Sequence, residues 1–103
     1  MLHTRVENGD TPVIYLEGEL DLDSVETFRW AVTDALRGVT EAILDFSRVS
    51  FIDSSGTGLL VRFCLDYKAQ GVQLRLRSIP PVVDDVFGML KVRALVGDEA
   101  FLD

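Results

Sequence analysis

The chain contains few of the residues from which catalytic and metal sites are built. Its 103 residues include one cysteine, Cys64, and one histidine, His3. A single cysteine excludes an internal disulfide and suits a reducing compartment. Zinc sites need clusters of His and Cys ligands, and a Ser-His-Asp hydrolase needs a well-placed base, which a histidine so close to the terminus does not supply. We therefore expect no metal, no cofactor and no enzymatic activity.

Long apolar runs are also absent. No stretch approaches the roughly 18 apolar residues that a membrane-spanning helix requires. Residues 1–7 lack the apolar segment of a signal peptide. The Gly-Lys-Ser/Thr loop that cradles nucleotide phosphates is missing as well. The lack of a long apolar run and of a signal segment argues against a membrane role and makes the cytoplasm the expected location.

Positive charge is scarce. The chain has 10 Lys and Arg residues against 17 Asp and Glu residues, so its net charge is -7 and its pI is about 4.5. Such a chain repels the phosphate backbone, and we expect no nucleic-acid binding. The acidity suits a basic protein partner, and it also suits a simple role in solubility.

The residues that are present predict one folded domain over residues 1–103. The length is sufficient to bury a core without disulfides or metals, and 48% of the residues are hydrophobic. We expect an edge strand at 4–6, a turn at Asn8-Gly9-Asp10, and a strand at 12–17 that closes with Gly18-Glu19-Leu20-Asp21.

The first helix is indicated by an apolar stripe that begins at Val25 and ends at Leu36. Asp23 is its expected N-cap, with Glu26 three residues later as in a capping box. Gly38 suits its end. Trp30 falls on the opposite side from the stripe. It is either an exposed interface anchor or a residue covered by a loop or by the C-terminal tail.

The second half continues the alternation of strands and helices. We expect a strand at 42–46, a helix from Asp53 to about Gly71, and a strand at 72–76. A third helix opens at Pro81. Residues 94–103 suggest a short strand and a frayed helical end. The order β-β-α-β-α-β-α predicts an α/β fold with a partly parallel sheet.

Residues 51–60, Phe-Ile-Asp-Ser-Ser-Gly-Thr-Gly-Leu-Leu, lie where a strand passes into a helix. Such a junction exposes backbone N–H groups and favours negative charge. Asp53 or Ser54 can cap the helix. With Leu60, Phe63, Cys64 and Tyr67 turned toward the sheet, a helical wheel places four residues on the outer side: Ser55, Leu59, Arg62 and Asp66.

Gly56 and Gly58 are costly choices in a helix, at about 1 kcal/mol each relative to alanine. They suit a close approach of another backbone or tight packing on the sheet. By itself, Asp-Ser-Ser-Gly is also typical of an ordinary cap followed by a turn. The surrounding sequence is needed to decide between these interpretations.

The longer pattern resembles the STAS domain, in particular the bacterial anti-anti-sigma factors. Ile43-Leu44-Asp45-Phe46-Ser47 and the following Asp53-Ser54-Ser55-Gly56 match that family's central strand and motif, and Gly18-Glu19-Leu20-Asp21 matches its other recurring tetrapeptide. The resemblance covers Val13 to about Leu90. It implies the STAS fold, a mixed sheet of four to five strands with helices mainly on one face.

The resemblance also implies a function. In the family, the second serine of the motif is phosphorylated by an anti-sigma factor that is also a serine kinase, and a serine phosphatase reverses the modification. Binding of the unphosphorylated protein to the kinase releases a sigma factor. By position the phosphorylated residue is Ser55, although Thr57 offers a second hydroxyl. The expected partner-binding residues are Asp21, Asp23, Asp53, Ser54, Gly56, Thr57, Gly58, Leu59 and Arg62.

Two alternatives remain from the sequence. One is a STAS adaptor that scaffolds a stress-signalling or transporter complex without a phosphorylation cycle. The other is a serine hydrolase, which an active-site-directed serine reagent would detect. Asp21 also has two interpretations, since it either contacts a partner or caps the first helix.

Overall fold

Alternating apolar residues form the four strands of one mixed sheet in the computed structural model, which describes residues 1–102. The sheet order is β1-β2-β3-β4. β1 is antiparallel to β2, whereas β2, β3 and β4 are parallel to one another. The strands are β1 (Leu2–Glu7), β2 (Val13–Leu20), β3 (Glu41–Ile52) and β4 (Gln73–Arg77).

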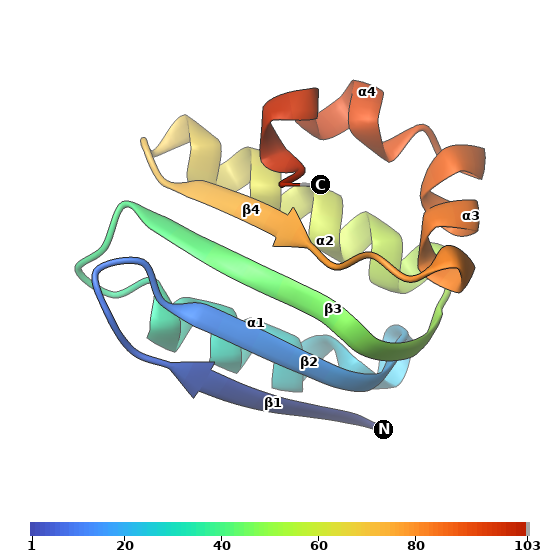
Figure 1. Ribbon diagram of the computed structural model, residues 1–103, viewed down its shortest axis with the longest axis horizontal. Helices are drawn as coiled ribbons and strands as arrows, with labels where there is room; N and C mark the ends of the chain where they lie inside the picture. The colour runs from blue at the N-terminus through green and yellow to red at the C-terminus, as the bar shows by residue number, and fades with distance from the viewer. Residues whose placement is uncertain (103) are drawn as a thin grey trace.

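Helices connect the parallel strands and cover one face of the sheet. Figure 1 shows α1 and α2 together behind the sheet, with α3 and α4 beyond the β4 edge. None of the helices within residues 1–102 has both the length and the apolarity to cross a bilayer. The helical segments are η1 (Leu22–Ser24), α1 (Val25–Ala35), α2 (Ser54–Ala69), α3 (Pro81–Met89), α4 (Val92–Val96) and η2 (Asp98–Ala100).

The predicted α/β fold and its element order are confirmed, and four strands form the sheet. β2 and β3 are longer than expected because their ends pair with each other, Leu20 opposite Ile52. The tail differs from the prediction, because it contains α4 and η2 in place of a short strand. A single bridge from Leu76 to Phe101 is the only strand-like pairing of the described tail residues. Asp103 lies outside the described residues.

The core lies between the sheet and the helices. Phe28 of α1, Leu60 of α2 and Leu44 of β3 are fully buried. Cys64 is buried in the same core, as predicted, and burial raises the pKa of its thiol to about 12. Trp30 is 72% exposed, which confirms that it is not a core residue.

The first turn of α2 is pressed against the end of β2. A Cβ atom placed on Gly56 would lie 2.0 Å from the carbonyl oxygen of Leu20. The same oxygen accepts a hydrogen bond from the backbone N–H of Asp53, with an N–O distance of 3.4 Å. Gly58, two residues later, would meet no atom within 4 Å if it carried a Cβ. Tight packing therefore explains Gly56 and does not explain Gly58.

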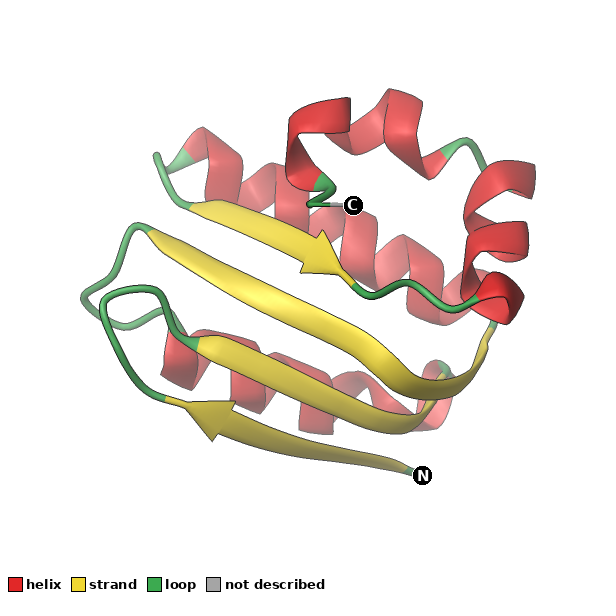
Figure 2. Cartoon of the chain, in the orientation of Figure 1, coloured by secondary structure: helices red, strands yellow, loops and turns green. Residues whose placement is uncertain are grey.

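The opposite face of the sheet carries a row of polar residues. Figure 2 shows the strands in front of the helices, so no helix within residues 1–102 covers this face. Arg5, Tyr15, Asp45 and Arg77 lie opposite one another in turn, from β1 across to β4. The guanidinium of Arg77 donates to the Asp45 carboxylate at 2.8 Å and to the Tyr15 hydroxyl at 3.3 Å. The guanidinium of Arg5 lies over the Tyr15 ring, 4.1 Å from its centre, so one connected row ties all four strands together.

Asp45 is the buried charge of this row, with 5% of its surface exposed. Its other carboxylate oxygen accepts hydrogen bonds from the backbone N–H and the hydroxyl of Ser47. Burial alone would raise the pKa of Asp45. The hydrogen bonds from Ser47 and Arg77 outweigh burial and hold that pKa below its usual range.

The two glycines give a paired test of the α2 packing. Gly56→Ala should lower the free energy of unfolding by about 1–3 kcal/mol, because the methyl group collides with backbone at Leu20. Gly58→Ala should leave it unchanged or raise it by up to about 1 kcal/mol, because alanine is the better helix former. Urea unfolding of both variants measures the difference. Equal effects of the two changes would contradict the packing described here.

Asp45→Asn should destabilise the fold by about 1–3 kcal/mol at neutral pH, because Arg77 loses its charged partner. The folded-state pKa of Asp45 is depressed, so the advantage of the unmodified chain is present above about pH 4, the usual aspartate pKa. It should disappear as the pH falls below that value. Thermal melts from about pH 2.5 to 7 provide the measurement, and Asp34→Asn, at an exposed helix position, is the control. A stability difference that did not change with pH would count against the charged pair.

Candidate functional site

The candidate site lies at the edge of the sheet where the parallel strands end. The carboxyl ends of β2 and β3 meet there, because Leu20 and Ile52 are register partners. η1 follows β2 after one residue, and α2 follows β3 after one residue. The two motifs singled out in the sequence, residues 18–21 and 53–56, are therefore neighbours in space.

Asp53 fixes the beginning of α2. Its backbone is extended, with φ -114° and ψ -177°, and its carboxylate accepts a hydrogen bond from the N–H of Gly56 at 2.7 Å. Its backbone carbonyl accepts from both the N–H and the hydroxyl of Thr57, at 2.9 and 2.8 Å. Of the two cap candidates, Asp53 and Ser54, the structure selects Asp53.

The three hydroxyl groups near this cap differ in accessibility. Ser54 and Ser55 are exposed in the first turn of α2. Thr57 is only 2% exposed, and its hydroxyl is already bonded to Asp53. This corrects the expectation that Thr57 offers a second accessible hydroxyl. Gly56 is buried as well, so these two residues fix the helix start while the two serines face outward.

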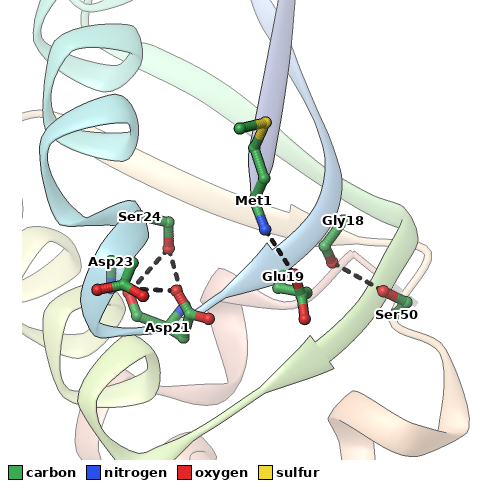
Figure 3. A network of polar contacts seen from close by, with 7 residues as sticks. All are labelled: Met1, Gly18, Glu19, Asp21, Asp23, Ser24 and Ser50. Atoms are coloured by element: carbon green, nitrogen blue, oxygen red, sulfur yellow. Dashed lines mark hydrogen bonds and ion pairs between the residues drawn. The ribbon is translucent and has the colours of Figure 1, made fainter.

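The neighbouring loop is fixed by Asp21 and Ser24. The Asp21 carboxylate accepts from the N–H of Asp23 at 3.1 Å, and the Ser24 hydroxyl bonds both the N–H and the carbonyl of Asp21 at 2.8 Å (Figure 3). The prediction that Asp23 is the N-cap with Glu26 as its capping-box partner is wrong. The cap lies two residues earlier, at Asp21. The carboxylate of Glu26 lies instead 3.8 Å from the guanidinium of Arg29.

The expected partner-binding residues divide into a surface set and a supporting set. Asp23, Ser54, Gly58 and Arg62 are exposed, Asp21, Asp53 and Leu59 are partly buried, and Gly56 and Thr57 are buried. Two apolar residues at the same edge were not foreseen: Leu22 is 69% exposed and Phe51 is 45% exposed. The outward position of Phe51 could have been inferred, since it alternates with the buried Ile52 along β3. We call the exposed set, together with Ser55, Leu22 and Phe51, the strand-end surface.

The chemistry available on the strand-end surface is that of a hydroxyl on a helix start. The first-turn N–H groups and the helix dipole favour negative charge at this position. His3 lies on β1 opposite Glu17, on the face of the sheet that carries no helix. No group of three or more His, Cys, Asp or Glu side chains within residues 1–102 is arranged to hold a metal ion.

Comparison with known proteins places this geometry in a family. The family model for the STAS domain matches residues 4–102. The intermembrane phospholipid transport system binding protein MlaB of Escherichia coli (strain K12) is 32% identical over 93 residues, which are 90% of this chain and 89% of MlaB. Osmosensory protein A of Mycobacterium tuberculosis (strain ATCC 25618 / H37Rv) is 33% identical over 76 residues, 74% of this chain. The match spans about half of that relative, 48% of its length.

Two solved structures of one protein are similar over most of the chain. The unphosphorylated anti-sigma factor antagonist SpoIIAA is 34% identical, with a TM-score of 0.64, and the match covers 86% of this chain and 83% of SpoIIAA. The phosphorylated form, from Bacillus, is 31% identical, with a TM-score of 0.66, and the match covers 92% and 87%. With the family model matching nearly every described residue, the chain belongs to the STAS domain family.

Proposed function

We propose that this chain is an anti-sigma factor antagonist whose binding is switched off by phosphorylation of Ser55. In this proposal the unmodified chain binds an anti-sigma factor that is also a serine kinase, and a sigma factor is released. The kinase transfers a phosphate from ATP to the Ser55 hydroxyl, and a serine phosphatase removes it. The chain itself has no catalytic role and acts in the cytoplasm, without binding nucleic acid or membrane.

One observation carries this proposal: Ser55 is exposed on the first turn of α2, and the residues before and after it hold that turn in place. Asp53 caps the turn, and Gly56 packs against Leu20. Thr57, the competing hydroxyl, is buried. A kinase could therefore reach Ser55 without unfolding the helix. The similarity to SpoIIAA, which is known in phosphorylated and unphosphorylated forms, supports this assignment.

The charge of the phosphate accounts for a switch in binding. A phosphoserine adds about -1.5 to -2 charges at neutral pH. At the start of α2 the helix dipole favours that charge, so the free protein tolerates it. In a complex that covers the strand-end surface, the charge would lie two residues from Asp53, at the sheet edge that also carries the exposed Leu22 and Phe51, where water is removed. Loss of binding would then follow without any change of fold.

The similarity to MlaB supports a second candidate function, that of an adaptor in a membrane transport complex. An adaptor would use the same strand-end surface, with Leu22 and Phe51 as apolar contacts, and would not require phosphorylation. The two functions predict different responses to charge at Ser55. That difference is the basis of the second test below.

We expect phosphate on Ser55 when the chain is incubated with ATP and the kinase that it captures from its own cell lysate. Exposure of the Ser55 hydroxyl and burial of Thr57 are the physical reasons. Peptide mass spectrometry locates the modification. Ser55→Ala should abolish it, and Thr57→Val should not. Phosphate on Ser54 alone, or on Thr57 alone, would contradict the assignment.

Ser55→Asp should lower the affinity for the anti-sigma factor by at least roughly 30-fold, whereas Ser55→Ala should bind like the unmodified chain. An unpaired charge desolvated at an interface costs about 2–5 kcal/mol, and about 1.4 kcal/mol is a tenfold change in affinity. Calorimetric titration measures the affinities, and thermal melts verify folding.

Thr33→Asp, which adds the same charge at an exposed position of α1, is the matched control and should bind normally. Equal affinities of Ser55→Asp and Ser55→Ala would contradict the switch and favour the adaptor function.

A further inference from the structure

The helix-free face of the sheet contains a hollow of about 340 Å³ that the proposed function does not use. Side chains from three strands line it, among them His3, Arg5, Tyr15, Glu17, Ser47 and Arg48. The hollow lies at a β-bulge, because the pairing of β2 with β3 shifts between Tyr15 and Glu17. The extra residue is on β3, between Asp45 and Arg48, and a bulge of this kind bends its strand and increases the local twist.

The ring of Tyr15 is one side of the hollow, and two arginines contact this residue. The guanidinium of Arg5 lies over the ring of Tyr15, 4.1 Å from the ring centre. The Tyr15 hydroxyl accepts a hydrogen bond from Arg77 at 3.3 Å. Ring and guanidinium are therefore held in place by their neighbours in the cross-strand row, so little ordering is needed when a ligand enters.

Free positive charge exceeds free negative charge in this hollow. Asp45 is already paired with Arg77 and bonded to Ser47. Glu17 has only a long contact with Arg48, at 3.5 Å. Among residues 1–102, Arg5 forms no ion pair, so its donors are available. The guanidiniums of Arg5 and Arg48 therefore lie near only one weakly paired carboxylate, that of Glu17. In a chain with a net charge of -7, this local excess of positive charge is unusual.

The chemistry of these groups selects a small oxyanion. An arginine fork matches the geometry of a carboxylate or phosphate and bonds it with two parallel N–H groups. A volume of about 340 Å³ is at the lower end of the range for small-molecule sites, roughly 300–1,000 Å³. We propose that the hollow binds a small anion, a carboxylate or a phosphate compound of a few carbon atoms, with Arg5 and Arg48 as its charged donors.

Glu17 sets the expected strength of binding. It competes with the anion for Arg48 and repels it, so we expect a dissociation constant on the order of 1 mM. Neutralising Glu17 should therefore tighten binding, which a merely structural role for this residue would not do.

The test is a titration of the full chain, labelled with ¹⁵N, monitored by amide chemical shifts at constant ionic strength. Sodium succinate and sodium phosphate are the two probes, and succinamide is the uncharged control. We expect saturable shifts at residues 4–6, 14–17 and 45–48 with at least one probe, and none with succinamide. Binding of succinate alone would identify a carboxylate site, and binding of phosphate alone a phosphate site.

Variants decide whether the hollow is responsible. Arg48→Gln and Arg5→Gln should each weaken binding about tenfold, because each removes a charged hydrogen-bond donor. Glu17→Gln should strengthen it several-fold. Arg37→Gln removes the same charge at a comparable exposure, 75% against 77% for the side chain of Arg48, and should have no effect. The spectra themselves report whether each variant is folded.

Three results would overturn the proposal. The first is that neither probe gives saturable shifts. The second is that the shifts fall outside the hollow. The third is that Arg48→Gln and Arg37→Gln respond alike, which would indicate a general effect of salt.

Discussion

The contact between Gly56 and the carbonyl of Leu20 is the constraint on which the strand-end surface depends. Without a side chain at Gly56, the first turn of α2 can lie against the end of β2, and the same carbonyl also accepts the Asp53 N–H. Asp53 then caps the turn, and Ser55 is left facing outward. Two motifs that are far apart in the sequence thus become one surface because two backbones approach closely.

The two faces of the sheet have different physical roles. The face covered by α1 and α2 is apolar and provides most of the burial that stabilises the fold. The uncovered face is held by the cross-strand row from Arg5 to Arg77, in which Asp45 is the buried charge. The strand-end surface lies at the edge between these faces. A charge added there can alter binding without disturbing either the apolar core or the polar row.

Local sequence patterns predicted the features that depend on neighbouring residues in the chain. The burial of Cys64, the exposure of Trp30 and a cap at Asp53 or Ser54 followed from helical periodicity and capping chemistry. The features that were missed depend on distant pairing. Asp23 is not the cap because β2 extends to Leu20, where it pairs with Ile52, and the chain turns directly afterwards at Asp21, which caps η1. The start of α4 depends on Lys91 in a left-handed conformation with φ 57°, which is unusual for lysine. The hollow lies at a bulge that no sequence pattern revealed.

The central claim is that phosphate on Ser55 changes the charge of a fixed surface and does not rearrange the fold. Amide chemical shifts and hydrogen exchange of the phosphorylated and unphosphorylated chains, compared without any partner, test it most directly. The account predicts changes confined to residues 20–23 and 53–59, with unchanged protection of the core strands β2, β3 and β4. Loss of protection along α2, or shifts that spread across the sheet, would show that the phosphate acts by unfolding or moving the helix and would contradict the claim.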